Sequence, residues 1–328
     1  MTQLLVLSLN PALDLEWRVD GFRVDEKNSI LAETRSAGGK GVNVARWLQF
    51  LGSKPELVVP LGGDTGRELA QCLRSERLPA HIIRLREATR VNVIVTTDAG
   101  RQMRFNPLGP KLSRAEWRGV LKRVQEKLTC LISNGGANVR ASRNCLCTSG
   151  ARGCSPNREQ LAKALLILSG SLPRGVPVKA YAQLIRLAHR LGVRTLLDCD
   201  GLAFAAAVKS RPFLVKPNEH ELAQWWRKPL RSETELVRAA RALSDQTGGW
   251  VLVSRGAKRS LLVNYRERFQ CAAAPPQVRT VNTVGAGDAL LAAVARQLQL
   301  GAPSREWLLS GVSVGSAATQ YSAGQLPR

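Results

Sequence analysis

The stretch TVNTVGAGDALLAAV (residues 280–294) places two glycines and an aspartate directly before an expected helix. Apolar residues after Gly287 recur at helical spacing, so the helix N-terminus falls at the glycines. Free amides and the positive dipole end of such a terminus attract anions, phosphate above all. Asp288 would repel an anion unless it faced another group. Two interpretations are therefore open: a plain helix cap, or a general base beside an anion-binding turn.

The usual glycine motifs of nucleotide-binding proteins are absent around this stretch. In the pattern G-x-G-x-x-G, Leu290 stands where the third glycine is needed. The segment GGKGVN has Gly41 after Lys40, where a Walker loop needs Ser or Thr. Other segments of the chain must therefore decide what the GAGD turn binds.

Outward from this stretch, short unbroken apolar runs alternate with amphipathic segments such as GVNVARWLQFLG (residues 41–52). Unbroken apolar strands indicate burial on both faces, as in a parallel sheet covered by helices. The sequence thus predicts an α/β fold with helices on both sides of a mostly parallel sheet. The apolar runs begin at Leu4, Glu56, Leu165, Arg194, Pro212 and Trp250.

Two segments depart from this alternation. Residues 89–106 alternate in period two around Asp98-Ala99-Gly100, which predicts an antiparallel hairpin in a small accessory sheet. Residues 130–160 lack periodicity and are rich in Ser, Asn, Gly, Arg and Cys, which predicts an irregular insert. The cysteines of this insert include only one close pair, C-x-C, so we favour free thiols over a zinc site.

The composition narrows the class of protein. The 328 residues are 44% hydrophobic and 22% charged, which is the balance of an ordinary globular protein. The formal net charge is +23, but the arginines are dispersed and aromatic residues make up only 5%. We therefore expect small phosphorylated ligands and no specific nucleic-acid partner. The short N-terminal apolar run and the scattered cysteines predict a cytoplasmic protein with reduced thiols and no membrane contact.

Several segments follow one another along the chain: LNPALD, SAGGKGVNVARWLQFLG, TRVNV, LSGSLPRGV, VKPNEHEL, VSRGA and NTVGAGDALLA. In this order they resemble the ribokinase-like sugar kinases, in the phosphofructokinase-B branch. The resemblance covers nearly the whole chain outside residues 130–160. It implies one ribokinase-like domain over residues 1–328, a three-layer α/β/α sandwich with a mostly parallel central sheet. Residues 15–36 and 88–106 would form a small β lid over the sugar, and ligands would bind at the carboxyl ends of the strands.

The resemblance gives the GAGD turn a catalytic role. Asp288 would be the catalytic base that takes a proton from a sugar hydroxyl. Gly285, Ala286 and Gly287 would form a backbone anion hole for the γ-phosphate of ATP. Mg²⁺ would bridge the ATP phosphates and water, with no direct protein ligand assigned.

The same resemblance implies a side of the site that binds ATP and Mg²⁺. Lys216 would approach phosphate, whereas Asn218 and Glu221 follow a buried strand and would face metal-bound water. Ser254 and Gly256 would line the nucleotide. Taken alone, KPNEHE also fits a plain helix start and VSRGA a strand-end turn.

The acceptor side is also implied by the matching motifs. Asp14 would accept hydrogen bonds from two sugar hydroxyls, and glycines would permit close backbone approach. Arg90 and Lys27 would hold a phosphate already present on the substrate. The implied acceptor residues are Asp14, Lys27, Gly38, Gly39, Asn43, Arg90 and Asn92.

We therefore expect an ATP-dependent carbohydrate kinase that converts fructose 1-phosphate to fructose 1,6-bisphosphate, because AGGKGVNVA resembles the 1-phosphofructokinases and tagatose-6-phosphate kinases. GSAAT and LGGDTG resemble the minor-type 6-phosphofructokinases, so tagatose 6-phosphate and fructose 6-phosphate are alternative acceptors. A catalytically impaired sugar-phosphate binding protein is the alternative of another class, because Arg259, LDCDGLA and the absent final helix depart from the family pattern. The resemblance also implies a homodimer through the lid, which would cover exposed sheet edges.

Overall fold

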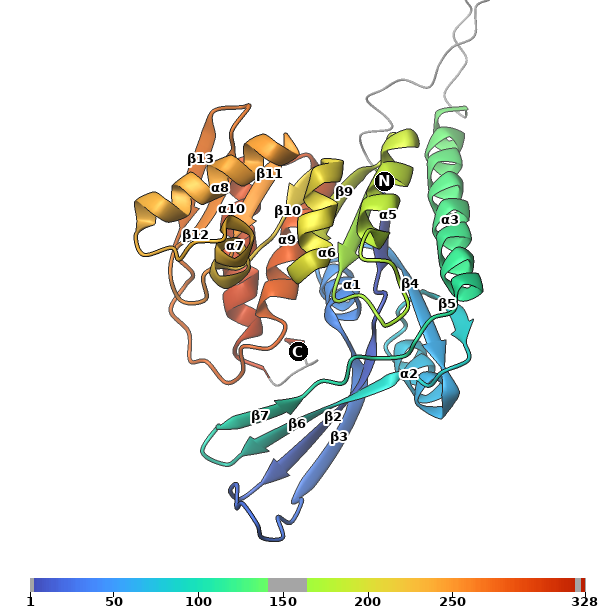
Figure 1. The fold of residues 1–328 in the computed structure, drawn as a ribbon, viewed down its shortest axis with the longest axis vertical. Helices are drawn as coiled ribbons and strands as arrows, with labels where there is room; N and C mark the ends of the chain where they lie inside the picture. Colours follow the sequence, from blue (N-terminus) through green and yellow to red (C-terminus); the bar gives the residue numbers. More distant parts are fainter. Residues whose placement is uncertain (1–2, 141–163, 322–325, 328) are drawn as a thin grey trace, which may run out of the picture.

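The computed structural model describes residues 3–140, 164–321 and 326–327, and its centre is a nine-stranded sheet (Figure 1). The strand order is β13-β12-β11-β10-β9-β8-β1-β4-β5. All pairings from β11 to β5 are parallel, and only β12 and β13 run antiparallel to their neighbours. The strands are β1 (Leu4–Leu7), β4 (Pro55–Gly62), β5 (Ala80–Leu85), β8 (Leu165–Ser169), β9 (Arg194–Asp198), β10 (Leu214–Val215), β11 (Trp250–Val253), β12 (Ser260–Asn264) and β13 (Phe269–Ala273).

Helices cover both faces of this sheet, because central strands such as β1 and β8 are buried at every residue. One core cluster joins the sheet to α3, α5, α6, α7 and α8, and a second joins it to α1, α2, α9 and α10. The predicted three-layer α/β/α architecture is confirmed. The helices are α1 (Lys40–Phe50), α2 (Gly63–Ser75), α3 (Arg114–Arg140), α5 (Ala180–Arg190), α6 (Gly201–Ala207), the 3-10 helix η1 (Val208–Ser210), α7 (Glu219–Trp226), α8 (Glu233–Thr247), α9 (Ala286–Leu300) and α10 (Ser304–Ala318).

A separate four-stranded sheet extends away from the main body, as Figure 1 shows. Its order is β3-β2-β6-β7, from β2 (Ala12–Val19), β3 (Ala32–Gly38), β6 (Arg90–Thr97) and β7 (Gln102–Phe105). The hairpin predicted around Asp98-Ala99-Gly100 is the β6–β7 pair, which is antiparallel. The two lid segments expected at residues 15–36 and 88–106 thus form a single sheet, in which β2 and β6 pair in parallel.

The predicted irregular insert at residues 130–160 is wrong at its beginning. Helix α3 continues to Arg140, because its buried face repeats at Trp117, Val120, Val124, Leu128 and Leu131 with helical spacing. The small and polar residues that follow hid this helix from a reading of composition. Residues 141–160, with Cys145, Cys147 and Cys154, lie outside the described part of the chain.

The apolar runs from Leu4, Glu56, Leu165, Arg194, Pro212 and Trp250 all contain a strand of the main sheet. In the described part of the chain, helices long and apolar enough to cross a membrane are absent. Cys72, Cys199 and Cys271 form no disulfide.

Candidate active site

A cavity of about 1070 Å³ opens at the carboxyl ends of the parallel strands and reaches the inner face of the four-stranded sheet. This position agrees with the general rule for ligands of open α/β sheets. The cavity brings together most of the predicted site residues, although they come from both ends of the chain. Those that line it are Asp14, Gly39, Asn43, Arg90, Asn92, Lys216, Asn218, Glu221, Ser254, Gly256, Gly285, Ala286, Gly287 and Asp288.

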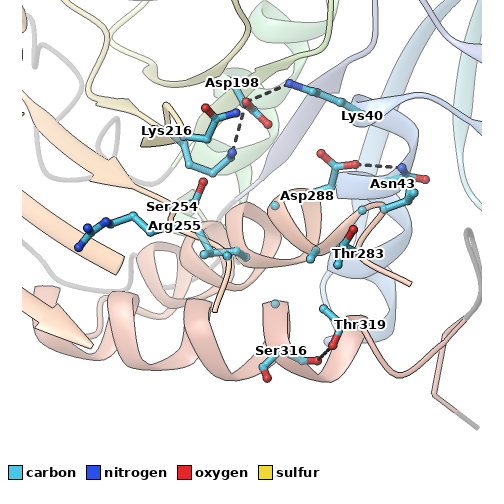
Figure 2. A pocket seen from close by; sticks show the side chains of 18 of the residues that line it. Lys40, Asn43, Asp198, Lys216, Ser254, Arg255, Thr283, Asp288, Ser316 and Thr319 are labelled. Atoms are coloured by element: carbon cyan, nitrogen blue, oxygen red, sulfur yellow. Dashed lines mark hydrogen bonds and ion pairs between the residues drawn. The ribbon is translucent and has the colours of Figure 1, made fainter. Parts of the chain in front are cut away.

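The GAGD turn forms the N-terminus of α9. Gly285 is its N-cap residue with φ of 80°, a left-handed conformation that glycine adopts without steric cost, and no side chain caps the helix. The first amides of the helix therefore lack intrahelical acceptors at the cavity wall, and that of Ala286 donates to the Thr283 carbonyl at 3.4 Å. The Asp288 side chain does not act as the cap that the first interpretation required. Its Oδ2 accepts a hydrogen bond of 2.9 Å from Asn43 Nδ2 on α1 (Figure 2).

Asp288 is buried, with 5% of its surface exposed. Burial, followed by the nearby Asp198 carboxylate, raises its pKa to about 7, against the lowering effects of Lys40, Asn43 and Lys216. A carboxyl group with this pKa can gain and lose a proton near neutral pH, which suits a general base.

Two lysines and one aspartate lie near Asp288, in the upper part of Figure 2. Lys40 Nζ is 3.5 Å and Lys216 Nζ is 3.4 Å from Asp198 Oδ1. A side chain at position 287 would meet Lys216 Nζ at 3.4 Å, so this ammonium group lies beside the amides of the GAGD turn. The site thus offers backbone amides and two ammonium groups to a single anion.

The loop after β10 meets the loop after β11 along the nucleotide side of the predicted site. Asn218 and Glu221 form a reciprocal capping box at the start of α7, with hydrogen bonds of 2.8 Å in both directions. The helix-start interpretation of KPNEHE therefore holds for the Asn218 side chain. Ser254 donates its amide to the Pro217 carbonyl at 3.1 Å, so Ser254 is held directly against this helix start.

The acceptor side is built on β2, β3 and β6. Asp14 Oδ1 accepts a 2.8 Å hydrogen bond from Asn92 Nδ2, and burial raises the pKa of Asp14. Gly38 lies against the Asp14 carboxylate, where a Cβ atom would overlap it, and Gly39 has φ of 100°. Both glycines are thus required by the local geometry before any ligand is considered.

The two cations predicted to bind a substrate phosphate lie in different places. Arg90 lines the cavity, but its terminal nitrogens donate to the Pro107 and Asn10 carbonyls at 2.9 and 2.8 Å. It therefore also fastens two loops at the cavity wall. Lys27 lies in the exposed turn between β2 and β3 and does not line this cavity.

Comparison with known proteins decides the family. The model of the family described as "pfkB family carbohydrate kinase" matches residues 4–134 and 152–328. The match covers most of the chain and leaves out residues 135–151. The chain belongs to the pfkB family of carbohydrate kinases. It is thus an ATP-dependent sugar kinase with the ribokinase-like fold.

Individual members of the pfkB family are similar over nearly their whole length. The ATP-dependent 6-phosphofructokinase isozyme 2 of Escherichia coli is 31% identical over 97% of this chain and 93% of its own. The 1-phosphofructokinase of Rhodobacter capsulatus is 32% identical over 99% of this chain and 90% of its own. A crystal structure of the Escherichia coli phosphofructokinase-2 in complex with fructose-6-phosphate has a TM-score of 0.82, with 30% identity, and covers 98% of this chain and 94% of that one.

The carboxylate oxygens of this pfkB site fit a hydrated Mg²⁺ ion. Among the described residues, the buried Asp198 carboxylate has two ammonium groups near Oδ1 at ion-pair distance and no partner at Oδ2, and Glu221 keeps Oε1 outside its capping box. The described residues contain no group of three or more His, Cys, Asp or Glu side chains that would form a complete metal cage. An ion here would therefore take most of its ligands from ATP phosphates and water.

Among the cavity-lining residues that were missed from the sequence are Lys40, Asp198 and Arg255. Lys40 stands among three glycines, and Asp198 is the last residue of a buried strand, so both carried a usable signal. Arg255 carried none. Arg259, which departs from the family pattern, does not line the cavity, whereas Arg255 does.

Proposed function

We propose that this pfkB kinase transfers the γ-phosphoryl group of ATP to a hydroxyl of a ketohexose phosphate, namely fructose 1-phosphate. The observation that carries the proposal is the Asp288 carboxylate, buried at a helix start that no side chain caps and that lines the cavity. The base and the anion hole thus share one helix start that lines the cavity, next to the position where the phosphoryl group would transfer. This geometry supports in-line phosphoryl transfer, which depends on positioning and charge neutralisation.

In this proposal each part of the site has one task. Asp14, Asn92 and the backbone at Gly39 hold the sugar hydroxyls, and Gly38 leaves room for the Asp14 carboxylate. Asp288 accepts the proton of the attacking hydroxyl through the oxygen that faces the cavity, while Asn43 keeps the other oxygen in place.

Backbone amides and lysine ammonium groups of the protein stabilise the negative charge of the transferred group. The Gly287 amide and the Lys216 ammonium group beside it face the developing negative charge. Lys40 adds a second positive charge, held 3.5 Å from Asp198 before ligands arrive. Bound Mg²⁺ would neutralise the ATP phosphates, with Glu221 and Asp198 accepting hydrogen bonds from its water ligands.

The choice of fructose 1-phosphate rests on the segment AGGKGVNVA, which forms the Gly39–Lys40 wall of the cavity. Similarity by itself is not decisive, because relatives named for 6-phosphofructokinase and 1-phosphofructokinase activities are 31% and 32% identical. Fructose 6-phosphate and tagatose 6-phosphate are the alternatives.

The decisive measurement is coupled ADP release with fructose 1-phosphate, fructose 6-phosphate and tagatose 6-phosphate in parallel. We expect the highest kcat/KM with fructose 1-phosphate. Asp288→Asn should lower kcat by about 10² to 10⁴ without a comparable rise in either KM, because the base acts in the chemical step. Binding of the sugar phosphates without turnover would instead support a non-catalytic binding protein.

We also propose that two copies associate through the outer face of the four-stranded sheet. Because side chains alternate along a strand, Val93, Val95, Met103 and Phe105 point away from the cavity that Ile94 and Arg104 line. Met103 and Phe105 are 44% and 53% exposed. A second copy of this apolar face would cover these side chains.

A further inference from the structure

The side chain of Arg46 lies beneath the candidate site and does not line the cavity. It belongs to α1 and is only 6% exposed. Two of its nitrogens contact the Glu76 carboxylate at 2.8 and 2.9 Å, so the buried charge has a bidentate counter-ion where α2 ends. The remaining contacts of this guanidinium lead toward the predicted base and the acceptor glycines.

The first of these contacts fixes the Asn43 side chain. Arg46 Nη1 donates to Asn43 Oδ1 at 3.0 Å, and Asn43 Nδ2 donates to Asp288 Oδ2 at 2.9 Å. A guanidinium group can only donate, so the amide must present its oxygen to Arg46 and its NH₂ group to Asp288. Arg46 therefore determines which way round the amide sits, and that orientation holds one oxygen of the base.

The second contact reaches the acceptor loop. Arg46 Nη2 donates to the Ala37 carbonyl at 2.6 Å, directly before Gly38 and Gly39. The Arg46 charge also lowers the pKa of Asp14, against the larger effect of burial. One buried guanidinium is thus connected to the base through a side chain and to the sugar side through the main chain.

We propose that Arg46 is a positioning residue for phosphoryl transfer, which acts through Asn43 on Asp288 and through Ala37 on the acceptor glycines. The proposal rests on the function proposed above. It assigns no contact with substrate to Arg46. Lysine could not replace it, because a single ammonium group lacks the planar fork that reaches Glu76, Ala37 and Asn43 together.

The pH profile separates this role from a purely structural one. The charged and polar groups that act on Asp288 are Asp198, Lys40, Lys216 and Asn43, and the Asn43 hydrogen bond lowers the pKa of Asp288. If Asn43 loses its orientation, this hydrogen bond weakens and the pKa of Asp288 rises. A base must be deprotonated to act, so the acidic limb of the kcat/KM profile moves to higher pH.

The test is a double-mutant cycle of Arg46→Lys and Asn43→Ala, measured as kcat/KM against pH with the sugar phosphate that the wild type turns over. We expect Arg46→Lys to lower kcat/KM about tenfold to a hundredfold and to shift the acidic limb upward. In the Asn43→Ala background, Arg46→Lys should lower kcat/KM much less, because the hydrogen bond from Asn43 to Asp288 is already lost.

Arg35→Lys is the matched control. Arg35 also pairs with a carboxylate of α2, Glu68, at 3.1 Å, but it lies on β3 away from the cavity. Its replacement should leave the pH profile unchanged. If Arg46→Lys does not fold, Glu76→Gln keeps Arg46 and removes the charge of its partner, and should give a smaller shift in the same direction.

Three results would overturn the inference while the proposed function stands: additive effects in the cycle, an unshifted acidic limb in Arg46→Lys, or an equal shift in Arg35→Lys. A wild-type protein that phosphorylates none of the sugar phosphates would contradict the proposed function itself.

Discussion

At the scale of the residue, Asp288 combines a burial that opposes its charge with neighbours that stabilise that charge. Burial and Asp198 raise its pKa, whereas Lys40, Asn43 and Lys216 lower it, and the balance lies at about 7. Its pKa is therefore higher in the folded chain than in the unfolded chain. The folded protein holds this proton more tightly, so the contribution to stability is complete below about pH 4 and is lost as the pH rises through about 7.

This balance predicts a stability gain on removing the charge. Asp288→Asn should raise the melting temperature at pH 8, where the wild type carries a buried charge, and the gain should disappear near pH 4. The free energy of unfolding should change by at most about 4 kcal/mol. Thermal unfolding at both pH values checks this, with Asp98→Asn as an exposed control. An equal gain at pH 4 would contradict the raised pKa.

Single residues also show how far the sequence reached. Asn43 and Asp288 were both predicted for the site, but their hydrogen bond joins positions 245 residues apart, and no local pattern encodes it. Arg90 was predicted to bind phosphate, but its use by two backbone carbonyls depends on the tertiary positions of Pro107 and Asn10. Lys40 and Asp198 stood in visible motifs and could have been found by asking which side chains end strands at the carboxyl edge.

At the scale of the element, the loop after β11 depends on an ion-pair network for its position. Arg255 contacts Glu219 at 3.1 Å and Glu233 at 2.7 Å, and its side chain is only 9% exposed. Ser254 and Gly256 on either side line the cavity. Arg255 thus ties the predicted nucleotide wall to the starts of α7 and α8.

We expect Arg255→Met to raise the KM for ATP about tenfold, since hydrogen bonds to charged groups contribute about 1.5–3 kcal/mol each. The KM for the sugar phosphate should not change. Lys258→Met, in the same loop but 68% exposed at its side chain, is the control and should leave both values unchanged. Steady-state kinetics, with ATP and the sugar phosphate varied in turn, measures both KM values. A rise in both would argue against a role of Arg255 confined to the predicted nucleotide wall.

The elements themselves followed from the sequence to different degrees. Strand runs and the β6–β7 hairpin were predicted because apolar continuity and period-two alternation are local signals. The extension of α3 to Arg140 was missed, because glycines and polar residues there lower helix propensity while packing at Leu128 and Leu131 favours the helix. The parallel pairing of β2 with β6 is a tertiary property that periodicity does not contain.

At the scale of the whole molecule, the four-stranded sheet extends away from the main body (Figure 1). Its apolar outer face predicts self-association. Phe105→Glu should convert a dimer to a monomer, because a carboxylate would be buried against a second copy of the face. Sedimentation velocity measures the oligomeric state directly. Leu300→Glu, at an exposed position on α9, is the control and should not change that state. A wild-type monomer at micromolar concentration would refute the proposed association.

The hydrogen bond between Asn43 and Asp288 joins an early and a late part of the chain, so the site can form only near the end of synthesis. Asn43 belongs to the first helix and Asp288 to the ninth in the labelled order, so a chain growing from the ribosome carries the acceptor glycines long before it carries a base. Contacts between such distant positions form late in folding. A nascent chain that lacks α9 therefore has neither the proposed base nor the GAGD amides, so the proposed phosphoryl transfer requires that α9 has been made and has packed against α1.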